Sequence, residues 1–252
     1  MPTTRNIKLT IEYDGTDFNG WQIQKKEFRT VQSEIKSILE KILGEKIILF
    51  GSGRTDSGVH ALGQVANFKT TSSLDCKQLL KALNHNLADD IAIHKVEEVP
   101  LDFHAQFSAK SKIYRYTILN RSTPTAHLRN FVYFFPHKIN FNAFKHEIKL
   151  LTGKKNFKSF QSSPSDDRGK KINTVRTVKK ISVRKKQDFI YIDIEADGFL
   201  YKMVRNIIGT LLDVASGRLE KGSIKKILAK ENRIAASKPA DARGLCLLEV
   251  KY

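Results

Sequence analysis

Alternating apolar and polar positions along this chain of 252 residues predict a series of half-buried strands. The alternation is clearest at residues 7–13, 113–119 and 189–195. Shorter, more apolar runs predict further strands at 47–50, 64–68, 91–99 and 245–250. Because side chains repeat every two residues along a strand, each alternating segment is expected to bury one face.

Apolar residues at helical spacing predict amphipathic helices between these strands. Polar residues suited to capping a helix N-terminus precede four of them, at Thr30, Asp75, Asn142 and Ser223. Glycines are expected to end three helices, at Gly44, Gly153 and Gly217. The most apolar helix is predicted over residues 201–215.

Strands and helices alternate with short connections, which favours an α/β (α+β) fold with mixed, mainly antiparallel sheets and packed helices. A short internal echo supports two similar halves, because Ile-Glu-Tyr-Asp-Gly at 11–15 and Ile-Glu-Ala-Asp-Gly at 194–198 each end a strand before an amphipathic helix. We expect an N-terminal half over residues 1–105 and a C-terminal half over 106–252, facing each other across a central cleft.

Positive charge is concentrated in the second half. The chain has 44 Lys and Arg against 26 Asp and Glu, a net charge of +18. Residues 1–105 hold 13 basic and 14 acidic side chains, whereas residues 106–252 hold 31 and 12. A one-sided basic surface indicates a phosphate backbone as partner. The alternative interpretation is a general abundance of lysine that keeps the surface soluble.

The densest basic segment spans residues 154–186. Phe157 and Phe160 lie among its first lysines, and residues 162–167 within it predict a mobile loop.

Several classes of protein are disfavoured by composition. Cys76 and Cys246 are far apart and are expected to be free thiols, and no histidine or cysteine pair has metal-ligand spacing. No apolar run is long enough to span a membrane, and the first residues lead directly into a strand pattern. We therefore expect a cytosolic, cytoplasmic protein with no metal.

The most distinctive segment is Gly-Ser-Gly-Arg-Thr-Asp-Ser-Gly-Val-His at residues 51–60. An aspartate in such a turn ordinarily bonds its own backbone. Here Arg54 lies two residues before Asp56, and the glycines exceed what one hairpin needs, which favours a carboxylate held rigidly for chemistry. The segment is not a phosphate-binding P-loop, a dinucleotide site or a nucleophile elbow, because none of those glycine patterns is present.

Three other positions are candidates for the same site. Arg205 lies in the most apolar helix, where a shielded guanidinium needs a carboxylate such as Asp56 or a phosphate; a guanidinium that reaches the surface is the alternative. Tyr114 and Tyr116 lie on one face of their predicted strand. Packing is the default role for each tyrosine. The functional alternative is to stack on a base or to move a proton. Trp21, the only tryptophan, is expected to anchor a buried loop.

The segment Gly-Arg-Thr-Asp-Ser-Gly-Val-His-Ala at 53–61 resembles the signature of the tRNA pseudouridine synthase A family. Nearly the whole chain resembles this family in order and spacing, at residues 12–15, 20–22, 30–32, 63–65, 103–105, 107–109, 114–116, 176–177, 199–201 and 203–206. Gln106 stands where the family usually has arginine, and Lys202 where it has histidine. Several of the departures from the family pattern lie in expected RNA-contact regions, which bears on the uridines and tRNAs that are accepted.

The resemblance implies a pseudouridine synthase fold and isomerisation of uridine to pseudouridine at positions 38–40 of the tRNA anticodon stem-loop. It also implies no cofactor, and a homodimer that binds tRNA across both subunits. By matching position, Asp56 would be the catalytic aspartate, Tyr114 would sit against the target base and Arg205 would pair with Asp56. Further expected substrate contacts are Arg54, Lys202, Lys154, Lys155 and Lys158.

Such a reaction breaks the N1–C1′ bond, turns the uracil and rejoins it through C5, so no atoms are gained or lost. The base must be flipped out to be reached. An aspartate is ionised and nucleophilic at neutral pH; attack on C6, attack on C1′ and removal of the C2′ proton all stay open. Tyr114 is the candidate for removing the C5 proton.

Two other functions are weaker hypotheses. A non-catalytic RNA-binding module would explain the basic half but not the carboxylate set among glycines. A methyltransferase would need a glycine-rich strand–helix turn, and a metal nuclease would need clustered acids; the sequence has neither.

Overall fold

The computed structural model describes residues 3–25, 27–162 and 172–252, and the chain divides into two compact units. Unit 1 comprises Met1–Lys110 with Cys246–Tyr252, and unit 2 comprises Ser111–Leu245. The predicted boundary at 105/106 falls a few residues before the observed one. The C-terminal strand, expected in the second half, belongs to unit 1 because it pairs with a strand there.

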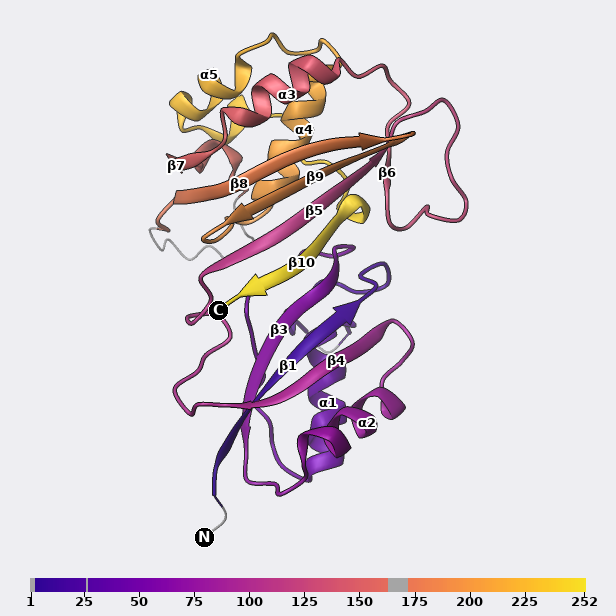
Figure 1. The fold of residues 1–252 in the computed structure, drawn as a ribbon, viewed down its shortest axis with the longest axis vertical. Helices are drawn as coiled ribbons and strands as arrows, with labels where there is room; N and C mark the ends of the chain where they lie inside the picture. Colours follow the sequence, from indigo (N-terminus) through magenta and orange to yellow (C-terminus); the bar gives the residue numbers. More distant parts are fainter. Residues whose placement is uncertain (1–2, 26, 163–171) are drawn as a thin grey trace. The chain divides into compact units, whose positions relative to one another are not determined.

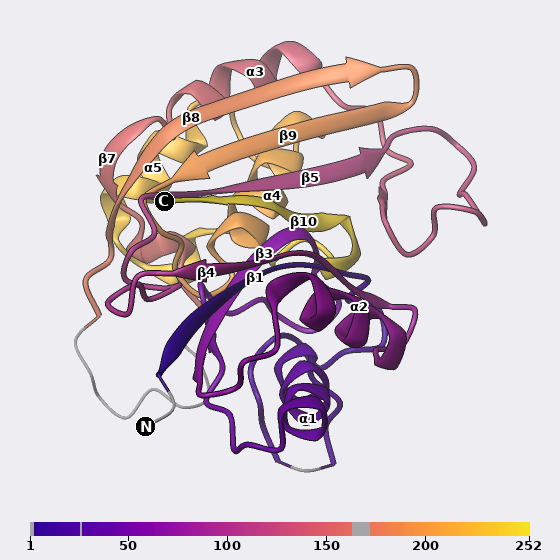
Figure 2. The same ribbon diagram turned by 60° about the horizontal axis from the view of Figure 1, so that its bottom comes forward.

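Unit 1 is a sheet with two helices on one of its faces (Figures 1 and 2). Its elements are β1 (Arg5–Tyr13), α1 (Val31–Leu43), β2 (Phe50–Gly51), β3 (His60–Thr70), α2 (Cys76–Asn86), β4 (Ile91–Val99) and β10 (Leu245–Lys251). The strands follow the order β4-β1-β3-β10. Strand β1 is antiparallel to β3 and β4, β2 is antiparallel to β3, and β10 is parallel to β3.

Unit 2 contains its own set of paired strands, with α3, α4 and α5 on one side of them (Figures 1 and 2). Its elements are β5 (Ser111–Leu119), β6 (Tyr133–Phe134), α3 (Phe141–Lys149), β7 (Gly153–Asn156), η1 (Lys158–Phe160), β8 (Val175–Lys186), β9 (Phe189–Ala196), α4 (Met203–Ala215), α5 (Ser223–Lys230), η2 (Arg233–Ala235) and η3 (Ala242–Gly244). Strands β5, β9, β8 and β7 follow in that order, each antiparallel to the next, and β6 is parallel to β5.

Mixed, mainly antiparallel sheets covered by helices confirm the predicted α+β class. The alternation in β1 correctly indicates its buried face: Ile7, Leu9 and Ile11 are all buried, with exposed fractions of 1%, 0% and 0%. Most of the predicted loop at 162–167 lies outside the described residues. In the part of the chain that the structure describes, no helix is long and apolar enough to cross a membrane.

Two predicted helix starts are confirmed in detail. The Thr30 hydroxyl accepts the Ser33 amide at 3.3 Å, which begins α1. The Asp75 carboxylate accepts the Lys77 amide at 2.7 Å, which begins α2. These caps are local, since each side chain satisfies amides two or three residues ahead.

Two other predictions were wrong. The run 47–50 is not a full strand, because only Phe50–Gly51 pairs with β3. Side chains of α1 bond two groups of that backbone: Glu40 Oε1 accepts the Ile47 amide at 2.9 Å, and Gln32 Nε2 donates to the Leu49 carbonyl at 2.8 Å. Helix α3 begins earlier than predicted, because Asn140 rather than Asn142 is its cap: the Asn140 side chain accepts the Ala143 amide at 3.0 Å.

Helix α5 also begins differently from the prediction. Its N-cap is Gly222, with φ of 89°, and Ser223 is its first residue. The cap is supplied from α3: the fully buried carboxylate of Glu147 accepts the Gly222 amide at 2.6 Å and the Ile224 amide at 3.1 Å. A carboxylate at a helix N-terminus also interacts favourably with the helix dipole. Glu147 therefore ties α5 to α3.

We predict that Glu147→Ala lowers the free energy of unfolding by about 2–4 kcal/mol, because two amides lose a charged acceptor inside the protein. Denaturant unfolding measures this change. The matched control is Asn142→Ala on the exposed side of the same helix, which should change stability by less than about 0.5 kcal/mol. Equal effects of the two substitutions would contradict the role given to Glu147.

Candidate active site

The segment 51–60, named the motif loop, connects β2 to β3 as predicted. Asp56 is half-buried on this loop and Arg54 is exposed. The Asp56 carbonyl accepts the Val59 amide at 3.2 Å, which closes a tight turn directly after the carboxylate. The backbone that carries the carboxylate is therefore fixed locally.

A second loop, residues 14–21, binds the motif loop through the main chain. The Trp21 amide donates to the Thr55 carbonyl at 3.1 Å. The Phe18 carbonyl accepts the Ser57 hydroxyl at 3.1 Å. These hydrogen bonds lie on either side of the candidate carboxylate, so its loop cannot shift without breaking them.

Side chains add to this attachment. The hydroxyls of Tyr13 and Thr55 are 2.8 Å apart, and burial raises the pKa of Tyr13, which keeps its hydroxyl neutral. The Gly15 amide donates to His60 Nδ1 at 3.0 Å. His60 is buried at the start of β3, so the imidazole ties the end of the motif loop to the loop that follows β1.

Two glycines allow the loops to approach this closely. A Cβ atom at Gly15 would lie 2.0 Å from the Val59 carbonyl oxygen. At Gly20, whose φ is +85°, a Cβ would lie 2.5 Å from the Thr55 carbonyl oxygen. No other residue type fits against backbone atoms at these distances, and a positive φ also favours glycine.

The base of the motif loop is held by buried polar and aromatic side chains. The Ser52 hydroxyl donates to Gln64 Oε1 at 2.7 Å, and Gln64 Nε2 donates to the Gly53 carbonyl at 3.0 Å. The Trp21 ring lies on Gly51, where a Cβ would be 2.4 Å from the indole nitrogen. Trp21 is 1% exposed, which confirms its predicted role as a buried anchor.

In unit 2, Tyr114 and Tyr116 share one face of β5, as predicted, opposite Ile194 and Ile192 of β9. The Tyr114 ring is 8% exposed and stands edge-on to Phe199, with ring centroids 5.0 Å apart. The two tyrosines thus share a face but have different surroundings.

Tyr116 has the surroundings of a structural residue. It is fully buried, its hydroxyl donates to the Asp241 carbonyl at 2.8 Å, and burial raises its pKa well above the ordinary value. Its ring also leaves no room at Gly244, where a Cβ would lie 2.8 Å from Tyr116 Cζ. Packing accounts for Tyr116, and Tyr114 stays the candidate for chemistry.

Arg205 lies in the first turn of α4 and is half-buried. Its Nε donates to the Ala240 carbonyl at 2.8 Å, and the Ala240 amide donates back to the Arg205 carbonyl at 2.9 Å. The segment before Ala240 packs tightly on the helix, since a Cβ at Gly209 would lie 2.0 Å from the Lys238 carbonyl oxygen. The direction of the guanidinium is therefore fixed by main chain.

The next residue, Asn206, is fully buried and joins three segments of unit 2. Its amide nitrogen donates to the Phe160 carbonyl at 2.7 Å, and its oxygen accepts Arg233 Nη2 at 2.9 Å. Asn206 thereby holds η1 and η2 against α4 and supports the position of Arg205.

The predicted lysines are distributed around unit 2. Lys202 is half-buried with φ of 57°, an uncommon left-handed conformation, and immediately precedes α4. Lys154 and Lys155 are on β7, and Lys158 begins η1. Lys154 and Lys158 are exposed and Lys155 is half-buried.

Asp56 and Arg54 lie on one loop of unit 1, whereas Tyr114, Arg205 and Lys202 belong to unit 2. The pairing of Asp56 with Arg205 joins residues of different units and stays a prediction. Among the described residues, no group of three His, Cys, Asp or Glu side chains is placed to hold a metal ion.

The sequence interpretation gave no role to His60 or Gln64. Both lie within segments that resembled the family, but a single histidine or glutamine beside a strand carries no chemical signal of its own. Their function is to hold the motif loop, and this is visible only once the partners Gly15, Ser52 and Gly53 are known.

Comparisons with known proteins give the family of the chain. A family model described as tRNA pseudouridine synthase matches residues 9–108 and 148–252. tRNA pseudouridine synthase A of Acetivibrio thermocellus is 43% identical over 248 residues, covering 98% of this chain and 100% of that protein. The proteins of the same name from Thermoanaerobacter sp. strain X514 and Clostridium acetobutylicum are 41% and 42% identical, with the same coverage.

We predict that Gly20→Ala lowers the free energy of unfolding by about 3 kcal/mol, because the new methyl group collides with the Thr55 carbonyl. Gly44→Ala is the matched control: Gly44 also has positive φ, +67°, but a Cβ there meets nothing within 4 Å. The control should lose only about 1 kcal/mol, from backbone strain. Equal losses in denaturant unfolding would mean that the close approach of the two loops is unimportant.

Proposed function

The chain belongs to the tRNA pseudouridine synthase family, and we propose that it isomerises uridine at positions 38–40 of the tRNA anticodon stem-loop, with Asp56 as the nucleophile. One observation carries this proposal: Asp56 lies on a loop fixed on both sides of the carboxylate by main-chain and side-chain hydrogen bonds. A carboxylate held this rigidly is already ordered in the folded protein. Bringing it to the reacting atom therefore costs little further conformational entropy.

The chemistry needs an ionised carboxylate and a base removed from its stack. Opening the N1–C1′ bond, turning the uracil and closing a C5–C1′ bond moves one proton from C5 to solvent and returns one to N1. The carboxylate acts at C6, at C1′ or on the C2′ proton. All three routes require the carboxylate to lie next to the flipped-out nucleotide. Arg54, two residues away on the same loop and exposed, is proposed to hold that nucleotide.

Unit 2 is proposed to supply the remaining groups. Tyr114, largely buried with its ring against Phe199, faces the target base and takes the C5 proton, directly or through water. Arg205, directed by the Ala240 carbonyl, pairs with Asp56 and keeps it charged when water is excluded. Lys202, Lys154, Lys155 and Lys158 contact the RNA backbone.

The family also supports a proposal on the setting of the reaction. We propose that the enzyme is cytoplasmic, where tRNA is its partner, and that it works as a homodimer with tRNA bound across both subunits. Support for a nucleic-acid partner comes from the charge, because the net +18 is carried by the second half of the chain.

We predict that Asp56→Asn lowers the rate of tritium release from C5-labelled tRNA by roughly 10³-fold or more, while the Kd for tRNA changes by less than about threefold. Asp17→Asn, an exposed aspartate in the loop 14–21, is the matched control and should keep full activity. A transcript with cytidine at positions 38–40 should release no tritium. Full activity of Asp56→Asn would overturn the proposal.

We further predict that Tyr114→Phe lowers turnover at least about tenfold with little loss of stability, because only the hydroxyl that moves the proton is removed. Tyr116→Phe should do the opposite: it should cost about 1 kcal/mol of unfolding free energy, from the lost bond to Asp241, and leave turnover per folded molecule nearly unchanged. Turnover and denaturant unfolding of both variants check this. The reverse pattern would assign the chemistry to Tyr116.

A further inference from the structure

The net positive charge of the chain belongs entirely to unit 2. Residues 111–245 hold 29 Lys and Arg against 11 Asp and Glu, a net charge of +18. The rest of the chain, which forms unit 1, holds 15 of each and is neutral. A substrate as large and as negative as tRNA needs contacts on unit 2 beyond those at one nucleotide.

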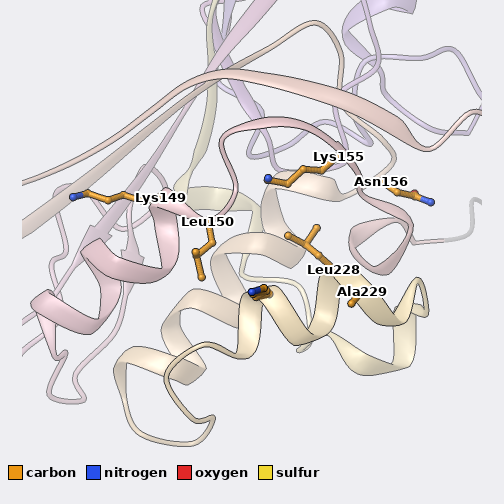
Figure 3. Close-up of a pocket in the computed structure, with 7 residues that line it drawn as sticks. Lys149, Leu150, Lys155, Asn156, Leu228 and Ala229 are labelled. Atoms are coloured by element: carbon orange, nitrogen blue, oxygen red, sulfur yellow. The ribbon is translucent and has the colours of Figure 1, made fainter.

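A surface hollow of about 550 Å³ lies where α3, β7 and α5 meet (Figure 3). Its lining combines three lysines with an apolar floor: Lys149, Lys155, Lys225, Asn156, Leu150, Leu228 and Ala229. Figure 3 shows Leu150 and Leu228 directed into the space between the three elements, with Lys155 across from Leu228. Lys149 lies at the end of α3, and its side chain extends away from the other labelled residues.

The lysines of the hollow have no acidic partners nearby in the described parts of the chain. None of Lys149, Lys155 and Lys225 is within ion-pair distance of a carboxylate there. Glu147, the acidic residue of α3, is buried and accepts amides of α5, and Glu220 pairs with Lys226 at 3.1 Å. The hollow is therefore positive at its rim.

Like charges continue from the hollow across the sheet. Lys155 of β7 is directly opposite Arg176 of β8, on the same face of the ladder. The same face of β5 carries Lys112, which stands two residues from Tyr114. Burial and, secondarily, the charge of Arg176 lower the pKa of Lys112 to about 8. Like charges placed opposite each other weaken a sheet, so the pair of Lys155 and Arg176 is stabilised by an anion.

We propose that the hollow of Lys149, Lys155 and Lys225 binds the phosphodiester backbone of tRNA, at nucleotides away from the target uridine. This inference rests on the proposed function, because it takes tRNA as the substrate. Lysines are point charges that contact phosphates without reading bases, and the apolar floor accepts a ribose. The contact therefore adds affinity for every tRNA substrate alike.

The location supports a contact remote from the chemistry. Strand β7 is the fourth in the order β5-β9-β8-β7, and Tyr114 lies on β5. Three spacings between neighbouring strands amount to about 14 Å, more than the separation of adjacent phosphates. The hollow thus meets nucleotides other than the one flipped toward Tyr114, and Lys112 and Arg176 lie along the path between them.

The test is the salt dependence of tRNA binding by the triple variant Lys149→Ala, Lys155→Ala, Lys225→Ala in the full-length chain. We expect Kd to rise about tenfold at about 0.1 M salt, and the slope of log K against log salt concentration to fall in magnitude by about 2 to 3. The matched control is Lys138→Ala, Lys185→Ala, Lys186→Ala, which removes the same charge from exposed positions of unit 2 outside the hollow.

The control should change Kd by about twofold or less, with a slope near that of the parent chain. Equal weakening by both triple variants would mean diffuse attraction and would overturn the proposal, as would a parental Kd and slope for the first variant. Denaturant unfolding confirms that both variants fold. Because the measurement is binding without turnover, its failure leaves the catalytic assignment of Asp56 standing.

Discussion

The candidate active site depends on the close approach of two backbone segments in unit 1. Loop 14–21 touches the motif loop 51–60 main chain to main chain, and it can do so only because Gly15 and Gly20 lack a side chain. The hydrogen bonds from Trp21, Ser57 and Gly15 then fix the motif loop from several directions. A carboxylate presented to a reacting nucleotide gains its catalytic power from such fixation.

Unit 2 obtains the same rigidity from buried polar side chains. Asn206 joins η1 and η2 to α4, the helix that carries Arg205, and Glu147 joins α5 to α3. In the described part of the chain, every buried polar side-chain atom has a hydrogen-bond partner. Glu147, the buried acid of unit 2, is committed to structure, and the unit as a whole carries 29 Lys and Arg against 11 Asp and Glu.

Local signals in the sequence were sufficient for most of the fold. Thr30 and Asp75 cap the next residues in the chain, and the alternation in β1 reports its buried face directly. The position of Asp56 on a loop between two strands was also predictable, because glycines cluster there. Its role as the nucleophile stays a prediction. Trp21 was correctly expected to be an anchor, as a large aromatic residue in a loop commonly is.

Interactions between distant residues could not be predicted in this way. Glu147 caps a helix that begins about 75 positions later, and Glu40 and Gln32 replace strand pairing at 47–49 through side chains of another element. No local pattern encodes these partners. The same holds for His60 and for the lysine hollow, whose residues come from three separate segments.

The central claim, that the carboxylate of Asp56 performs the chemistry, is tested most directly by a single-turnover measurement. With enzyme in excess, so that all the tRNA is bound, the conversion of uridine to pseudouridine is followed for the parent chain and for Asp56→Asn. Complete conversion by the parent and none by the variant, with the tRNA bound in both cases, is the predicted result. Conversion by the variant at the parental rate would contradict the claim.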